Sequence, residues 1–122
     1  VIVFDEPTAG LDPKGREDVM EIIRNYRKAT NATVIIISHS MEDMAALADK
    51  ILVLNKGELF MFDTPENVFS NGEELRKIGL NIPIVTKVFE ELSRLGIDLP
   101  KKPLTVDEAL EILKELKVGN NA

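Results

Sequence analysis

The first thirteen residues constrain the fold more than any other stretch of the chain. They read Val1-Ile2-Val3-Phe4-Asp5-Glu6-Pro7-Thr8-Ala9-Gly10-Leu11-Asp12-Pro13. A run of apolar residues without alternation is typical of a parallel strand that helices cover on both faces. Because ligands of such sheets bind beyond the carboxyl ends of the strands, we expect Asp5 and Glu6 to stand at a functional edge.

The two adjacent acids at this strand end suit two different tasks. Neighbouring side chains on a strand point in different directions, so one carboxylate can hold a hard cation, usually through water, while the other orients a nucleophile. Those are the two tasks of nucleotide hydrolysis. The alternative is a plain buried strand followed by a helix that Asp12 caps, which explains Asp12-Pro13 but not the whole string.

The string resembles the Walker B strand and the following D-loop of ABC-type ATPases, the motor subunits of ABC transporters. It matches the family pattern of four hydrophobic residues, then Asp5, Glu6 and Pro7, then a small-residue turn that ends in Leu-Asp. The resemblance implies that Asp5 positions Mg²⁺, through water, and that Glu6 polarises the water that attacks ATP. It also implies a loop that contacts a partner ATPase, formed by Ala9, Gly10, Leu11 and Asp12.

A second β-branched run, from Ala32 to Ile37, predicts another strand buried on both faces. The helix between the two strands begins at Pro13, and the strand–helix–strand order predicts a right-handed parallel crossover. His39, the only histidine, follows the second strand and therefore comes out at the same edge as Glu6. Without context, such a histidine is more often structural than functional.

The pair Ser38-His39 is similar to the switch loop, or H-loop, which follows the Walker B strand in ABC ATPases. This resemblance implies that His39 donates a hydrogen bond to the γ-phosphate of ATP. It also implies that His39 aligns Glu6 and the water rather than serving as the primary proton acceptor.

Element signals continue along the rest of the chain. The first helix has an apolar stripe that we expect to be buried, made of Val19, Ile22, Ile23 and Tyr26. Ser40 caps the next helix, with Asp43 completing a pair that resembles a capping box. A strand over 49–54, a turn at 55–57 and a return strand over 58–62 then predict a β-hairpin.

From about Gly72 the chain reads as all-helical, with helices expected over 73–78, 83–95 and 106–116. We therefore predict an α/β fold followed by an α-helical C-terminal extension. Residues 1–71 are expected to be the C-terminal part of a P-loop ABC ATPase core, with parallel strands, crossover helices and a terminal β-hairpin. Residues 72–122 are expected to be the extension.

Two helices of the extension carry apolar stripes. The stripes are Val85, Val88, Phe89, Leu92 and Leu95 in one helix and Val106, Ala109, Leu110, Leu113 and Leu116 in the other. They can pack against each other, against the motor or against a second copy of the chain. Intramolecular packing is the ordinary expectation, and a role in dimerisation is the alternative.

The extension narrows the resemblance to one branch of the family. The segments 64–69, 79–83 and 103–109 are similar to the C-terminal extension of energy-coupling factor ATPases, the CbiO-like motors of cobalt, nickel and vitamin importers. This resemblance implies ATP and Mg²⁺ as cofactors and a second ATPase subunit in a homodimer or heterodimer. It also implies peripheral docking at the cytoplasmic face of the cell membrane, on a transmembrane coupling protein that serves a substrate-binding membrane component.

Composition excludes several other classes. The net charge is −6, and acids outnumber bases in both halves of the chain, so no nucleic-acid partner is expected. The chain has no cysteine, which leaves no disulfide framework or thiolate metal site. No apolar run approaches the length of about 20 residues that a membrane-spanning helix needs.

The chain begins at Val1 in mid-strand and contains no G-x-x-x-x-G-K-[ST] phosphate loop. We expect a fragment that lacks this loop and the signature motif, and that alone neither binds ATP tightly nor hydrolyses it. Two alternatives stay open at this point. One is a noncatalytic dimerisation or interaction fragment, and the other is an ABC ATPase of a soluble DNA-repair or translation machine.

Overall fold

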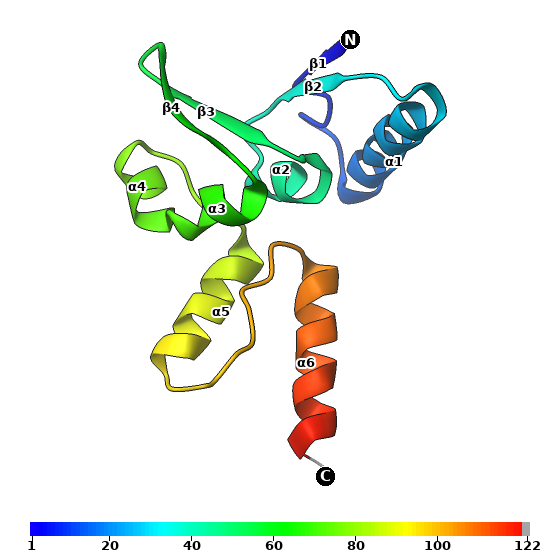
Figure 1. Cartoon of the computed structure of the whole chain (residues 1–122). Coiled ribbons are helices and arrows are strands. Elements are labelled where there is room, and N and C mark those ends of the chain that lie inside the picture. Colours follow the sequence, from blue (N-terminus) through cyan, green and yellow to red (C-terminus); the bar gives the residue numbers. More distant parts are fainter. Residues whose placement is uncertain (121–122) are drawn as a thin grey trace.

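The structure is a computed structural model that describes residues 1–120. Figure 1 shows an α/β part, from which α5 and α6 extend side by side. The predicted α/β fold, with a parallel strand pair, a hairpin and a helical extension, is confirmed. The elements, in chain order, are β1 (Ile2–Asp5), α1 (Pro13–Thr30), β2 (Val34–Ile37), α2 (Met41–Leu47), β3 (Ile51–Asn55), β4 (Glu58–Asp63), α3 (Pro65–Ser70), α4 (Gly72–Lys77), α5 (Ile84–Arg94) and α6 (Val106–Asn120).

The strands β1 and β2 pair in parallel, and α1 connects them, as the strand–helix–strand order predicts. The register sets Asp5 opposite Ile37, so both strands end at the same edge. Asp12 caps α1 by accepting a hydrogen bond from the Gly15 N–H at 2.9 Å, and Pro13 occupies the first turn. The start of the crossover helix therefore follows from its cap and its proline.

The prediction that both strands are buried on both faces is wrong. Val3, Ile35 and Ile37 share one face of the sheet and are 54%, 47% and 52% exposed. The reason is that β1 and β2 form a sheet of only two strands, and nothing in residues 1–120 covers this face. An apolar run indicates that both faces of a strand can be buried, but it does not identify the elements that would cover them.

The predicted stripe of α1 is only partly right. Ile23 is buried, whereas Ile22 is 65% exposed and Tyr26 is 39% exposed. Met20, which the stripe omits, is buried instead. The buried side of α1 is therefore the side that carries Met20 and Ile23, and α1 contacts α2.

The hairpin of β3 and β4 closes at a two-residue turn. Lys56 and Gly57 have φ angles of 52° and 78°, and this pair of left-handed residues is the turn that matches the twist of two antiparallel strands. On β3, Ile51 and Val53 are buried, whereas Leu52 and Leu54 are exposed. The hairpin therefore has one face on the core and one open face.

The main hydrophobic core lies where the hairpin meets α2, α3 and α4. Its buried members are Met44, Ile51, Val53, Val68, Phe69, Leu75, Ile82 and Leu104. These residues come from both sides of the expected boundary between residues 71 and 72. The division into a motor part and an extension thus stays a prediction.

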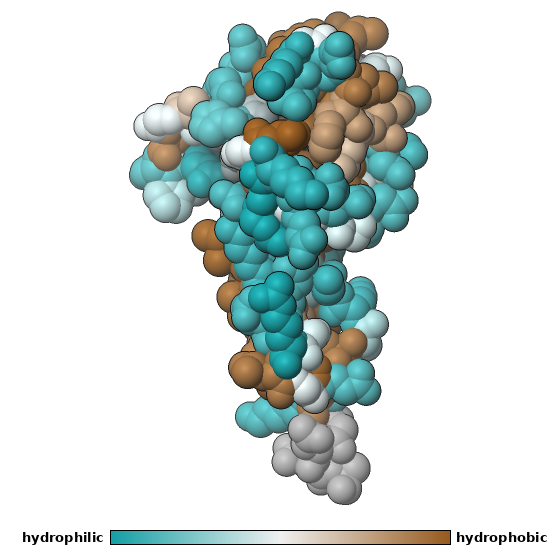
Figure 2. All heavy atoms as spheres, turned by 90° about the vertical axis from the view of Figure 1, so that its left-hand side faces the viewer, coloured by the Kyte–Doolittle hydropathy of each residue, from teal (hydrophilic) through white to brown (hydrophobic). Residues whose placement is uncertain are grey.

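A second, smaller core joins α5 and α6. Phe89, Ala109 and Ile112 are its buried residues, with Leu92 and Leu116 packed at its edge. The two stripes therefore pack partly against each other, as the ordinary expectation has it. Figure 2 shows apolar spheres on the surface along this extension. Five residues of the two predicted stripes stay 45–79% exposed, namely Val88, Leu95, Val106, Leu110 and Leu113.

Candidate functional site

Glu6 is the first residue beyond β1, and the chain bends at this residue. Its N–H donates to the Ile37 carbonyl at 2.8 Å, which continues the pairing of β1 with β2. Its φ angle is 49°, a left-handed conformation that costs a residue other than glycine about 1–3 kcal/mol. Such strained residues cluster at functional sites. Here the bend sets the side chain of Glu6 against a cavity, while Asp5 stays on the open face of the sheet.

His39 and Glu6 meet at this edge. The His39 Nδ1 atom lies 2.9 Å from the Glu6 Oε1 atom, and the two side chains are 83% and 36% exposed. A contact this open to solvent contributes little to the free energy of unfolding. The contact nevertheless fixes where the imidazole and the carboxylate lie relative to each other. The expectation that the two residues emerge together from neighbouring parallel strands agrees with this geometry.

The cavity beside this pair has a volume of about 210 Å³. Pockets that enclose a drug-sized ligand measure roughly 300–1,000 Å³, so this cavity is too small to enclose a whole nucleotide. Its lining combines the carboxylate and imidazole with hydroxyls, a guanidinium and a small-residue loop. The lining residues are Glu6, Thr8, Ala9, Gly10, Leu11, Arg16, Ser38, His39 and Ser40.

The remaining predicted site residues fall into two groups. Ala9, Gly10 and Leu11 line the cavity and are exposed, so they are accessible to another molecule. Asp12 instead caps α1 and does not line the cavity, and Asp5 lies outside the lining as well. The structure thus brings Glu6 and His39 together with three loop residues.

The Mg²⁺ role of Asp5 depends on what a single carboxylate can hold. In residues 1–120, no group of three or more His, Cys, Asp or Glu side chains is placed to bind a metal ion. Mg²⁺ usually keeps several waters and takes only one or two carboxylates together with substrate phosphates. The exposed Asp5 carboxylate fits a site of that kind, and its metal role stays a prediction.

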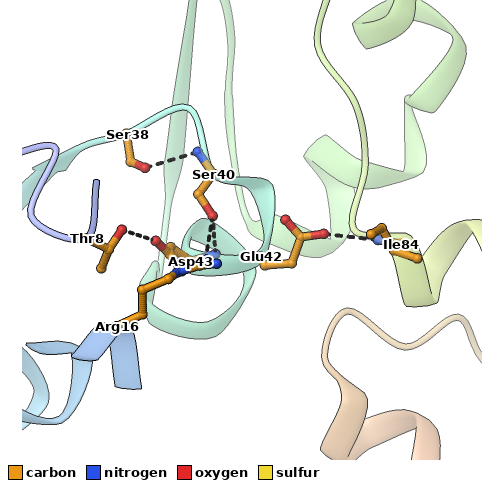
Figure 3. A network of polar contacts seen from close by, with 7 residues as sticks. All are labelled: Thr8, Arg16, Ser38, Ser40, Glu42, Asp43 and Ile84. Carbon is orange, nitrogen blue, oxygen red and sulfur yellow. Dashed lines mark hydrogen bonds and ion pairs between the residues drawn. The ribbon is translucent and has the colours of Figure 1, made fainter. Parts of the chain in front are cut away.

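Sequence reasoning missed a buried polar network beside the cavity. Asp43 is 2% exposed, and its carboxylate accepts from the Thr8 hydroxyl at 2.5 Å and from the Arg16 Nη2 at 2.7 Å (Figure 3). Arg16 also reaches the Ser40 hydroxyl at 3.2 Å. The network joins the loop after Glu6 to α1 and α2.

The expected capping box at the start of α2 differs from the observed cap. The Ser40 hydroxyl accepts from the Asp43 N–H at 3.2 Å, as expected, but the Asp43 carboxylate turns toward Thr8. The Ser38 hydroxyl accepts from the Ser40 N–H at 3.0 Å in its place. A carboxylate at this spacing has two possible partners, a local N–H or a distant side chain, and spacing alone favours the local one.

Comparisons with known proteins place the chain among transporter subunits. No protein-family model matches it. It is 42% identical over 122 residues to the energy-coupling factor transporter ATP-binding protein EcfA2 of Caldanaerobacter subterraneus, and 45% identical over 121 residues to EcfA2 of Clostridium perfringens. Each match covers 99% of this chain, and 43% and 42% of those relatives. The chain thus spans about two fifths of the length of the curated relatives that it matches.

Solved structures give the same picture. The structure of cbiO1 from Clostridium perfringens, part of the ABC transporter complex cbiONQ, is 30% identical with a TM-score of 0.54 and covers 78% of this chain and 34% of its own. An inward-facing conformation of a putative metal-chelate type ABC transporter is 28% identical with a TM-score of 0.55, over 63% of this chain and 30% of its own. Over nearly all of its residues, the chain therefore belongs to the family of energy-coupling factor ATP-binding proteins of ABC transporters.

Proposed function

We propose that Glu6 and His39 supply the water-orienting and phosphate-sensing groups of an ATP-hydrolysing motor subunit. This subunit would belong to an energy-coupling factor importer for cobalt, nickel or a vitamin. The observation that carries the proposal is the contact between Glu6 and His39 at 2.9 Å, at the carboxyl ends of two neighbouring parallel strands. Ligands of parallel sheets bind at such edges. The names of the relatives, which are ATP-binding proteins, support a nucleotide as that ligand.

The geometry suggests how the two side chains act on ATP. The Glu6 carboxylate accepts a hydrogen bond from the attacking water and orients it toward the γ-phosphorus. In its imidazolium form His39 has two donors, so Nδ1–H can reach Glu6 while Nε2–H is left for a γ-phosphate oxygen. Mg²⁺, held through water by Asp5, would supply positive charge against the phosphoryl oxygens. The chain's own residues thus act by positioning and polarisation.

The complete motor needs parts that these 122 residues do not contain. The sequence has no G-x-x-x-x-G-K-[ST] loop to hold the β- and γ-phosphates. We propose that this loop and the signature motif complete the site in the whole ATPase, and that residues 1–122 alone do not hydrolyse ATP. ATP turnover by the purified 122-residue chain would contradict this part of the proposal.

We also propose the partners. The exposed loop of Ala9, Gly10 and Leu11 would face a second ATPase subunit, in a homodimer or heterodimer. The pair would dock peripherally at the cytoplasmic face of the cell membrane, on a transmembrane coupling protein that serves a substrate-binding membrane component. Within residues 1–120, no helix is long and apolar enough to cross a bilayer. The names of the relatives, which are subunits of transporters, support this assembly.

A second candidate function is a noncatalytic interaction module. The observation that favours it is the exposed apolar surface of α5 and α6, where Leu110 and Leu113 are 45% and 49% exposed. Sedimentation of the chain tests whether this surface joins two copies. If the extension dimerises, Leu110→Glu with Leu113→Glu gives a monomer. If the chain is a monomer before and after the change, this surface does not join two copies.

The test of the main proposal is Glu6→Gln in the complete protein that carries these residues. Loss of a general base lowers turnover by about 10²-fold or more, while ATP binding stays nearly intact because the charge is not needed to hold the nucleotide. The matched control is Glu21→Gln, an exposed acid on α1, which should leave turnover unchanged. Equal turnover of the Glu6→Gln variant and the unmodified protein would remove Glu6 from this role.

A further inference from the structure

The buried carboxylate of Asp43 is the least expected feature near the site. It is 2% exposed, and its two oxygens accept from different partners, Thr8 and Arg16. A buried charge is strongly unfavourable unless it is paired and hydrogen-bonded. Here the pairing is complete, since no buried side-chain polar atom in the described residues lacks a partner.

The three partners come from three separate segments. Thr8 lies in the loop that follows Glu6, Arg16 is on α1, and Asp43 is on α2, which begins directly after His39-Ser40 (Figure 3). Asp43 therefore connects the loop next to one predicted catalytic residue with the helix next to the other. Its position makes it a link between Glu6 and His39 that does not enter the cavity, because it is not among the lining residues.

Thr8 is the anchor of its loop. It is 6% exposed, while Ala9, Gly10 and Leu11 beside it are exposed. The backbone bonds of the loop are local, from the Ala9 N–H to the Glu6 carbonyl and from the Leu11 N–H to the Thr8 carbonyl. Among the described residues, the Thr8 hydroxyl makes the side-chain hydrogen bond that ties this loop to α2.

We propose that Asp43 is a positioning residue for ATP hydrolysis, which acts through Thr8 and Arg16 to keep Glu6 and His39 at hydrogen-bond distance. This inference rests on the proposed function. Proximity makes the effect large, because a displacement of about 1 Å at a reacting group can cost roughly 10²-fold in rate. The contact of Glu6 with His39 is itself exposed and weak, so it needs a rigid frame on both sides.

A second ion pair in the same part of the chain provides a matched control. Arg27 on α1 pairs with Asp49, which follows α2, and these side chains are 50% and 70% exposed. This pair also connects α1 with the segment around α2, but it does not touch Thr8. Asp49→Asn therefore removes a link between the same two regions while the proposed clamp stays intact.

The first test measures the kinetics of ATP hydrolysis in the complete protein. Thr8→Val and Asp43→Asn should each lower kcat about tenfold, with the KM for ATP nearly unchanged, because geometry rather than binding is lost. Thr8→Ser keeps the hydroxyl and should restore kcat, and Asp49→Asn should have no effect. The double variant of Thr8→Val and Asp43→Asn should be no slower than the slower single variant, because both changes act on the same contact between Thr8 and Asp43.

Two kinetic results would overturn the inference. One is a Thr8→Val variant with unchanged kcat in a protein whose turnover depends on Glu6. The other is a parallel loss of kcat, ATP binding and thermal stability, which would mean that the network only supports folding. Loss of folding in Asp43→Asn does not block the test, since Thr8→Val removes a hydroxyl and leaves the ion pair with Arg16 in place.

Amide hydrogen exchange separates failure of this inference from failure of the proposed function. Exchange at Ala9 and Leu11 should be faster in Thr8→Val and Asp43→Asn and unchanged in Thr8→Ser and Asp49→Asn. If the protein shows no ATP turnover, the proposed function fails, whereas this exchange pattern still decides whether the clamp exists. Equal exchange in all four variants would overturn the clamp.

Discussion

The helical end of the molecule, α3 to α6, and the end that carries the site, with β1, α1, β2 and α2, are held together in different ways. In the helical end, Phe69, Leu75 and Phe89 are 1–2% exposed, and the helices pack around continuous apolar cores. In the end that carries the site, Val3 and Ile37 are more than half exposed. There Met20 and Ile23 are buried on α1, and polar contacts of Glu6 with His39 and of Asp43 with its two partners join the segments around the cavity. The order of the site therefore depends on a few directional bonds.

This difference separates stability from function. Apolar burial contributes broadly and tolerates small shifts, whereas a hydrogen bond between side chains is lost when one group moves. Changes in the helical end should thus lower the free energy of unfolding most. Changes in the strand end should affect the chemistry while altering stability less.

Phe89→Ala should destabilise the chain by about 3–5 kcal/mol, the usual cost of removing a buried aromatic ring. Phe89 is 2% exposed between α5 and α6, whereas its neighbour Val88 is 50% exposed. Val88→Ala is therefore the control, with an expected effect of less than about 1 kcal/mol. Urea unfolding measures both. Equal losses for the two variants would mean that α5 and α6 do not form the core described here.

Thr86→Val should cost about 1–3 kcal/mol, because it leaves the Pro103 carbonyl without its donor. The Thr86 hydroxyl donates to that carbonyl at 2.6 Å, and Thr86 is 2% exposed. Thr86→Ser keeps the hydroxyl and should recover much of the loss. A valine variant as stable as the original chain would show that this bond does not fix the segment between α5 and α6.

Glu42→Ala tests the polar contact between the two ends. The Glu42 carboxylate accepts from the Ile84 N–H at 3.3 Å, at the start of α5 (Figure 3). An acid at the positive end of a helix dipole is worth about 0.3–1 kcal/mol, so a small loss is expected in urea unfolding. The loss should shrink at high salt, because screening weakens exposed charges. A loss that does not depend on salt would contradict this assignment.

The smallest expected change in stability concerns Asp63, and it is followed through the pKa of this residue. The Asn67 side chain, and then the Thr64 N–H, hydrogen-bond the carboxylate and hold the pKa of Asp63 below its usual value of 3.8. A lowered pKa means that the contribution to stability is present above the unfolded-state pKa and is lost as the pH falls through the folded-state pKa. Asn67→Ala should raise the pKa of Asp63 in an NMR titration. An unchanged titration would exclude Asn67 as the main cause.

Local signals in the sequence were enough to predict the strands and helices and to predict that Glu6 and His39 lie close together. Apolar runs located β1 and β2, Asp12-Pro13 marked the start of α1, and parallel strand order predicted that Glu6 and His39 share an edge. These signals could not predict the exposure of Val3, because it depends on what lies on the second face of the sheet. The bond of Asp43 to Thr8 was also beyond them, since helix-cap spacing describes neighbours and Thr8 lies far away in the sequence.

The most direct measurement is a structure of the complete protein, carrying Glu6→Gln, with Mg²⁺ and ATP bound. The account predicts the γ-phosphate at the cavity beside residue 6, with His39 Nε2 within hydrogen-bond distance of a phosphate oxygen and a water between that phosphate and residue 6. ATP bound elsewhere, with His39 and residue 6 remote from the γ-phosphate, would contradict it.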